Sequence, residues 1–159
     1  MTAPDGVIDA LNECRKLEHT LAQCALQYFI YWRRWRFFGI MKDFRKLYKC
    51  AKKSKKALMA RIREFDVLPG SDAYPFDFTD VNSPEDIVAE MDYFVGMAND
   101  LIEAYVRAQI AATSENDSVT SSLLTRLKTK REFTLLQFEA KLKKVALLGA
   151  QGYLQEHVH

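Results

Sequence analysis

Residues 67–83, VLPGSDAYPFDFTDVNS, decide which helical fold this sequence predicts. The segment contains two prolines and a glycine, so it cannot be helical throughout. Its aromatic residues, Tyr74, Phe76 and Phe78, provide apolar surface with which to pack. We therefore expect a long, ordered crossover between two helical halves of the chain.

Two helices, at about 5–37 and 41–66, are predicted before the crossover. Apolar residues recur there at alternating steps of three and four, the spacing of one buried helix face. Gly39 is the only glycine between Gly6 and Gly70, so we place the turn near it. The two stripes are Leu11, Cys14, Glu18, Leu21, Ala25, Tyr28, Trp32 and Trp35, followed by Phe44, Leu47, Ala51, Ser54, Leu58 and Phe65.

A third helix is predicted at about 84–112. In the sequence NSPED, residues 82–86, Ser83 is expected to cap this helix and Pro84 to occupy its first position. The two acidic residues that follow suit the positive end of the helix dipole. The buried stripe of this helix is Ile87, Met91, Phe94, Ala98, Leu101 and Tyr105.

A fourth helix, at about 118–148, follows the polar break TSENDS at residues 113–118. It is expected to end near Gly149, with a short C-terminal helix at 150–157. Its central stretch, RLKTKREFTLLQFEAKL at residues 126–142, carries polar residues within the core-facing row. That row is Leu127, Arg131, Thr134, Phe138 and Leu142.

Four helices joined by short, long and short connections predict an all-α, ferritin-like four-helix bundle. The 159 residues are expected to form a single domain, 1–159, with enough chain to bury a core. An apolar fraction of 48%, with two Trp, seven Tyr and ten Phe, excludes a disordered chain.

The sequence favours a cytoplasmic protein. No apolar run approaches the roughly 18 residues that a membrane-spanning helix needs. The start, MTAPDGVIDALNE, lacks the basic-then-apolar order of a signal peptide. Cys14, Cys24 and Cys50 are odd in number and have no paired spacing, which suits a reducing compartment. We expect each to serve as a buried small apolar residue.

Charge is strongly segregated along the chain. Residues 33–63 contain thirteen of the 23 Lys and Arg and one acid, whereas residues 64–117 contain thirteen acids and one base. Two interpretations remain: helices with complementary outer faces, or a basic surface for an anionic partner. Nucleic acid is one such partner, because Lys and Arg residues interleave with aromatic residues in this segment and could contact phosphates while the rings stack on nucleobases. However, Trp32 and Trp35 lie on the core stripe, which favours an aromatic core with a basic outer face. The residues of this candidate basic surface are Arg33, Arg34, Arg36, Lys49, Lys52, Lys53, Lys55 and Lys56.

The sequence resembles the bacterioferritins, most closely at its two ends. GVIDALNE at residues 6–13 is similar to the opening segment of the family, and LGAQGYLQEHV at residues 148–158 is similar to its closing segment. Leu68 and Pro69 stand where the family has a Leu-Pro after its second helix. The resemblance covers nearly the whole chain and implies an oligomeric shell that stores iron.

The family places a di-iron site in the bundle core, with a Glu from two helices and a Glu-x-x-His from each of the other two. Position by position, the resemblance retains only Glu18. The other positions read Ala51, Ser54, Ala98, Arg131 and Thr134. If the first two helices are shifted by three residues, the positions become Leu21, Ser54 and Ala57. Neither register supplies a ligand set, so we expect no catalytic or metal-binding residues and no enzyme activity.

The methionine that the family uses to bind haem falls on Lys52, or on Lys55 in the shifted register. Lysine ligates iron only when deprotonated, so no haem and no other cofactor are expected within the bundle. Arg131, at a former ligand position, could form a buried ion pair with Glu18. Alternatively, its side chain could extend past Thr134 to solvent.

The remaining motifs are weak. Glu156, His157, Val158 and His159 include the only Glu-x-x-His of the chain, but they are its last residues and favour a frayed tail over a metal site. His19 is the only other histidine. No nucleotide-binding glycine loop, Ser/His/Asp order or Cys-x-x-Cys is present.

We therefore expect a non-catalytic, bacterioferritin-like shell subunit of an iron-storage assembly. It would form a homo-oligomer or co-assemble with an active ferroxidase subunit, and iron mineral would form only in an assembled shell. The alternative is a repurposed interaction module whose basic surface binds nucleic acid, membrane headgroups or an acidic protein.

Overall fold

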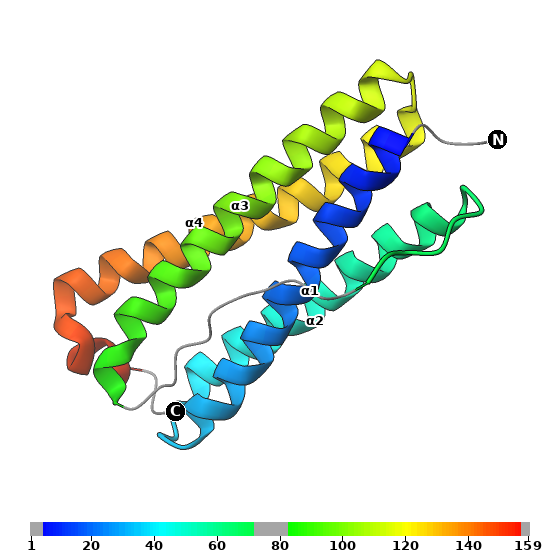
Figure 1. The fold of residues 1–159 in the computed structure, drawn as a ribbon. Coiled ribbons are helices and arrows are strands. Elements are labelled where there is room, and N and C mark those ends of the chain that lie inside the picture. The colour runs from blue at the N-terminus through cyan, green and yellow to red at the C-terminus, as the bar shows by residue number, and fades with distance from the viewer. Residues whose placement is uncertain (1–4, 72–82, 157–159) are drawn as a thin grey trace.

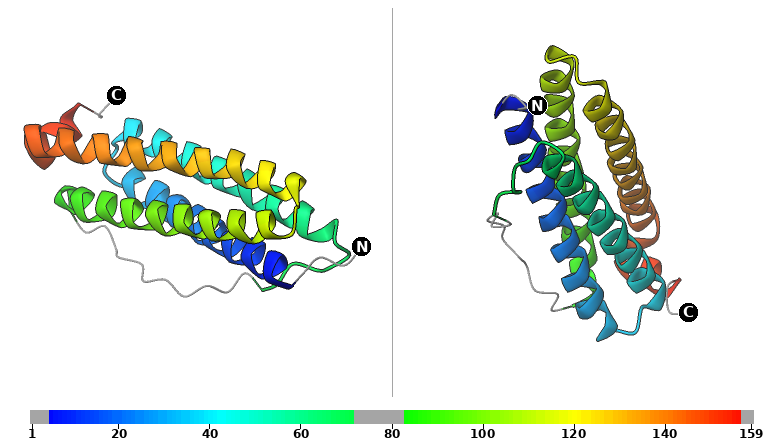
Figure 2. Two further views of the ribbon diagram at one scale, coloured as in Figure 1. Left: turned by 90° about the horizontal axis from the view of Figure 1, so that it is seen from above. Right: turned by 90° about the vertical axis from the view of Figure 1, so that its right-hand side faces the viewer.

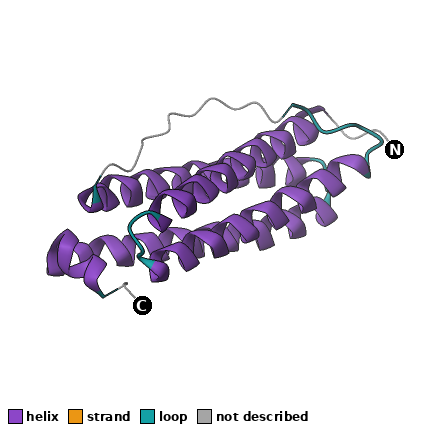
Figure 3. Ribbon diagram, turned by 90° about the horizontal axis from the view of Figure 1, so that it is seen from below, coloured by secondary structure: helices purple, strands orange, loops and turns teal. Residues whose placement is uncertain are grey.

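Four long helices form the described part of the chain, residues 5–71 and 83–156 of the computed structural model, and no strand occurs within it (Figures 1 and 3). The helices are α1 (Asp5–Arg33), α2 (Phe38–Arg63), α3 (Ile87–Ser114) and α4 (Ser118–Gln155), and a single 3₁₀ turn, η1 (Pro84–Asp86), precedes α3. Helix α2 ends and α3 begins at opposite ends of the bundle, as a long crossover requires (Figure 1). The predicted fold class, a ferritin-like bundle, is confirmed. None of these helices is both long and apolar enough to cross a membrane.

The four helices pack around a cluster of aromatic rings, one from each helix. Phe94 stacks on Phe138 with ring centroids 5.1 Å apart, and Phe44 and Tyr28 lie 5.3 and 5.4 Å from Phe94. Each buried side chain of this size contributes about 1.5–3 kcal/mol, and each ring pair adds about 0.5–1.5 kcal/mol. The three-and-four spacing thus places all four helices around one core (Figure 2).

The turn between α1 and α2 lies earlier than the sequence predicts. Helix α1 ends at Arg33, not at 37, and Gly39 lies inside the first turn of α2. The chain reverses direction at Arg36, which has a positive φ of 60°. The turn thus lies near Gly39, but it does not use the glycine: Arg36 adopts the left-handed conformation instead, at a cost of about 1 kcal/mol.

Two other predicted helix ends are also displaced. Helix α2 ends at Arg63, three residues earlier than expected, and Asp66 beyond it has a positive φ of 59°. Pro84 begins the helical segment as predicted, with Ser83 directly before it, but its first turn is the 3₁₀ turn η1 and regular α-helix starts only at Ile87. The Asp86 carboxylate accepts a hydrogen bond from the Ser83 backbone N–H at 3.1 Å, so the acidic side chain stabilises this end.

The chain leaves the helical conformation at Gly149 (φ 75°, ψ 159°) and resumes it in the last turns of α4. A positive φ with an extended ψ is accessible mainly to glycine. Beyond the break, Tyr153 and Leu154 are buried in the core. Gln151 donates a hydrogen bond to the Glu85 carboxylate, which joins this terminal segment to η1.

The start of the crossover is anchored on α1. Arg15 is fully buried, and its guanidinium donates to the Gly70 and Ser71 carbonyls at 2.9 and 2.7 Å. The Gly70 N–H donates to the Asn12 side-chain oxygen at 3.0 Å. Two polar side chains of α1 thus fix the point where the chain leaves α2. Tyr74, Phe76 and Phe78 lie outside the described residues, so their packing stays a prediction.

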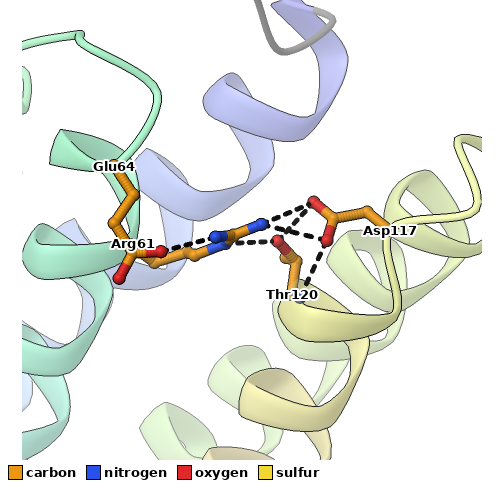
Figure 4. A network of polar contacts seen from close by, with 4 residues as sticks. All are labelled: Arg61, Glu64, Asp117 and Thr120. Atoms are coloured by element: carbon orange, nitrogen blue, oxygen red, sulfur yellow. Dashed lines mark hydrogen bonds and ion pairs between the residues drawn. The ribbon is translucent and has the colours of Figure 1, made fainter. Parts of the chain in front are cut away.

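A polar network centred on Arg61 links the end of α2 to the turn between α3 and α4 (Figure 4). The guanidinium contacts Asp117 at 3.0 Å and donates to the Thr120 hydroxyl at 2.9 Å. Asp117 also caps α4 by accepting from the Thr120 N–H at 3.0 Å. Burial alone would raise the pKa of Asp117, but the bonds from Thr120 and Arg61 together lower it. The network also joins the basic segment of the sequence to the acidic one.

Candidate functional site

The six residues expected at the family's ligand positions lie in the interior of the bundle. Helix α1 contributes Glu18, α2 contributes Ala51 and Ser54, α3 contributes Ala98, and α4 contributes Arg131 and Thr134. All six are buried. Three-and-four spacing places each of them on an inner helix face, so their burial follows from the sequence pattern. We call the set the Glu18 level.

Arg131 and Glu18 form an ion pair inside the Glu18 level. Arg131 Nε lies 3.3 Å from Glu18 Oε1, and both side chains have no exposed area. The alternative in which Arg131 extends to solvent was therefore wrong. The pairing involves Glu18 itself, which is the position named by the unshifted register.

Two side chains that the sequence did not identify complete the surroundings of the pair. The Tyr105 hydroxyl donates a hydrogen bond to Glu18 Oε1 at 2.7 Å. Arg131 Nη2 donates to Cys50 Sγ at 3.0 Å. Tyr105 was assigned only to the apolar stripe of α3, and Cys50 only to the buried small residues. Cys50 is in fact half-buried. The one signal in the sequence was the hydroxyl of Tyr105 itself, because a polar group on an inner stripe needs a hydrogen-bond partner inside the bundle.

Burial is the main influence on the pKa values of Glu18 and Tyr105. Burial raises the pKa of Glu18 above its ordinary value, while the Arg131 charge and the Tyr105 hydrogen bond act in the opposite direction. Burial, followed by the nearby Glu18 charge, raises the pKa of Tyr105 well above its ordinary value. Tyr105 therefore stays a neutral hydrogen-bond donor at neutral pH.

Several polar atoms of the Glu18 level lack a hydrogen-bond partner among the described residues. They are Glu18 Oε2, Ser54 Oγ, and Nε and Nη1 of Arg131. Buried polar groups are normally satisfied, and each unsatisfied one costs about 1–3 kcal/mol. The hydrogen-bonding capacity of the ion pair is therefore only partly used.

These residues do not fit a di-iron centre. Iron in such sites is bound by carboxylate oxygens and imidazole nitrogens. The single carboxylate here is already paired with a guanidinium, whose positive charge would oppose a metal ion beside it. Within residues 5–71 and 83–156, no group of three or more His, Cys, Asp or Glu could bind a metal ion.

The two lysines expected at the family's haem position make different contacts. Lys52 is exposed, with its ammonium 5.7 Å from the centre of the Tyr48 ring. Lys55, the position in the shifted register, lies 3.0 Å from His19 Nδ1.

Known proteins were compared with the chain. A family model described as a ferritin-like domain matches residues 8–148. The chain belongs to the ferritin-like family. A solved structure of Rhodobacter capsulatus bacterioferritin, described with a metal-free dinuclear site and a haem iron, superposes on this ferritin-like chain with a TM-score of 0.90. The sequences are 18% identical, and the match covers 100% of this chain and 97% of that one. A comparison with curated proteins found no match.

The basic surface lies mainly on the outside of α2. Seven of its eight residues are exposed, and Lys55 is half-buried against His19. Two of the arginines flank Trp35, and the Arg34 guanidinium lies 5.4 Å from the Trp35 ring centre. This segment therefore has an aromatic inner side and a basic outer side.

The C-terminal Glu-x-x-His lies only partly within the described residues. Glu156 lies 3.5 Å from Lys144, and the two terminal histidines are outside the described residues.

A second buried carboxyl was also missed by the sequence analysis. Glu90 of α3 accepts hydrogen bonds from the Trp32 indole N–H at 2.7 Å to each oxygen. Burial raises the pKa of Glu90 well above its ordinary value, opposed by Trp32 and reinforced by the charge of Asp86. The partner of Glu90 on α1 is Trp32, fourteen residues or roughly 21 Å along the helix from Glu18. That indole is the only side-chain donor that contacts Glu90 among the described residues. It therefore adds no second ligand to the Glu18 level.

Proposed function

We propose that this ferritin-like chain is a non-catalytic, bacterioferritin-like shell subunit of an iron-storage assembly. The observation that carries the proposal is the fully buried Arg131–Glu18 pair. We infer that these two residues occupy ligand positions of the family's di-iron site. The four long helices and the full-length similarity to a bacterioferritin support a role in which the subunit body is retained. Iron is then the cargo of the assembly and not a cofactor of this chain.

The chemistry of the Glu18 level supports a division of labour between subunits. Iron(II) oxidation needs several oxygen and nitrogen donors that converge on the metal. Here a buried guanidinium would repel an incoming cation, and the remaining polar atoms come from one serine and one carboxylate. A shell containing this chain would therefore depend on an active ferroxidase subunit to oxidise the iron that it stores.

Native mass and iron oxidation test this proposal together. The purified chain, alone and co-expressed with an active bacterioferritin, is measured by light scattering on a sizing column. We expect a large closed particle, either alone or only with the partner. A chain that stays a monomer or dimer under both conditions contradicts the shell proposal and favours the basic-surface alternative.

Oxidation is measured by adding iron(II) without oxygen and then admitting air. The chain alone should oxidise iron no faster than buffer, and mixed particles should oxidise it in proportion to their active subunits. Rhodobacter capsulatus bacterioferritin serves as the comparison protein. Oxidation clearly above buffer by the chain alone would show that it is itself a ferroxidase.

A further inference from the structure

A pocket of about 400 Å³ lies between α2 and α4. Two contacts across the helices bound it. Lys141 Nζ contacts Asp43 at 2.7 Å, and Arg131 Nη2 contacts Cys50 at 3.0 Å. Asp43 and Cys50 are two turns apart on α2, or roughly 10 Å. The pocket thus has the size of a small-molecule site, for which volumes of about 300–1,000 Å³ are usual.

The walls of the pocket are largely apolar. Leu47 of α2 and Phe138 of α4 are buried on its inner side. Phe133, one helical turn before Gln137 on the same wall, is 61% exposed although it is a large aromatic residue. Covering such a side chain with apolar atoms is favourable by about 25 cal/mol per Å² of area removed from water. The walls therefore suit a hydrocarbon chain.

The charged residues of the pocket are predominantly positive. Three lysines line it, Lys46, Lys130 and Lys141, against one acid, Asp43. The Lys141–Asp43 pair balances one of these charges. Lys46 on α2 and Lys130 on α4 remain, one from each wall. Their ammonium groups suit a carboxylate placed between the two helices.

We propose that this pocket binds a medium-chain aliphatic carboxylate, with its chain against Leu47, Phe133 and Phe138 and its headgroup between Lys46 and Lys130. The proposal goes beyond the shell function, because it needs only one copy of the chain. A failure of the native-mass experiment would leave it untouched, and its own failure would leave the shell proposal untouched.

Cys50 provides a reporter for the proposed site. It is half-buried and lines the pocket, whereas Cys14 and Cys24 are fully buried. Burial also raises the pKa of Cys14 far above its usual range and that of Cys24 to about 11, so both should react slowly. N-ethylmaleimide should therefore label one site in the native protein, and Cys50→Ser should abolish that labelling.

Decanoate is expected to slow the labelling of Cys50 in a saturable way. Octanoate and hexanoate should require higher concentrations, with a change of up to about fourfold for each CH₂ group removed, the equivalent of about 0.8 kcal/mol. Decyltrimethylammonium has a chain of the same length and a positive headgroup, so it should protect far less. Isothermal titration with decanoate provides an independent affinity.

Paired substitutions separate the headgroup contact from general charge. Changing Lys46 and Lys130 to Gln should weaken decanoate binding about tenfold or more, the equivalent of about 1.4 kcal/mol. The matched control changes Lys49 and Lys53 to Gln. Both are exposed on α2 but do not line the pocket, so affinity should be unchanged. Circular dichroism verifies that both variants fold.

Three results would overturn the proposal. The first is no protection of Cys50 by millimolar decanoate and no binding heat. The second is equal protection by the cationic amphiphile or equal loss of affinity in both lysine pairs. The third is labelling that is blocked in the assembled particle without ligand and restored on dissociation, because a second copy of the chain would then cover the pocket.

Discussion

Replacing Arg131 with Met gives a quantitative test of the buried ion pair. The variant leaves Glu18 fully buried, with the Tyr105 hydroxyl as its hydrogen-bond donor. Removing one partner of a buried pair costs about 3–5 kcal/mol. The cost has an upper limit, because an unpaired Glu18 can take up a proton and become neutral. For a carboxyl with an ordinary pKa of about 4.3, protonation at pH 7 costs about 1.36 kcal/mol for each of about 2.7 pH units, or about 3.7 kcal/mol. The substitution also removes buried guanidinium N–H groups that lack a hydrogen-bond partner, and this gain offsets part of the cost. We therefore expect Arg131→Met to lower the free energy of unfolding by about 3 kcal/mol at pH 7.

The loss should depend on pH in a defined direction. The folded-state pKa of Glu18 in Arg131→Met lies above its unfolded value, so the folded state binds more protons and stability falls as pH rises from about 4.3. At pH 5 the same protonation cost is only about 1 kcal/mol. Thermal unfolding should therefore show a melting temperature lowered by about 6–12 °C at pH 7 and by much less at pH 5. Wild type and variant must have the same assembly state and concentration.

A double-mutant cycle with Glu18→Leu isolates the interaction between the two side chains. Glu18→Leu alone leaves the guanidinium without its counter-charge and should also destabilise. The double variant replaces the pair with apolar groups, which is often neutral or stabilising by about 1–4 kcal/mol. If Arg131→Met is as stable as wild type at pH 7, or if the two single losses simply add, the pair does not stabilise the fold.

Three further predictions concern other polar contacts. Arg61→Met should lower the free energy of unfolding by about 1.5–3 kcal/mol, because it removes charge-assisted hydrogen bonds at the end of α2. The control Lys128→Met removes an ion pair within one helix and should cost about 0.5 kcal/mol or less. Equal losses of stability in urea unfolding would contradict this. Glu90→Gln should become increasingly stabilising as pH rises above the unfolded pKa of about 4.3, since the raised pKa of this buried carboxyl makes wild-type stability fall with pH; parallel profiles of urea midpoint against pH would exclude it. Asn12→Ala removes the acceptor of the Gly70 N–H and should speed hydrogen exchange at that amide; unchanged exchange would show that the bond does not restrain the crossover.

The sequence predicted the fold well because its signals are local. Apolar side chains spaced three and four apart determine a helix and the face that it buries, whatever lies opposite. The two prolines at 67–83 prevent one continuous helix, and the length of that segment allows a connection between opposite ends of a bundle. Turn positions were less accurate. Arg36 and Asp66 adopt positive φ values that their side chains do not encode.

The expectation that the chain lacks a di-iron ligand set rests on the sequence alone, because ligand chemistry belongs to individual side chains. Alanine and serine at the expected positions offer no carboxylate or imidazole. The direction taken by Arg131 was not. Periodicity places a residue on an inner face, but a long side chain can still turn toward solvent. Only the packing of four helices brings Glu18, Tyr105 and Cys50 within reach of Arg131. The same holds for the pocket between α2 and α4, since its two walls, at residues 43–50 and 129–141, are some 80 residues apart in sequence and become one surface only in the folded bundle.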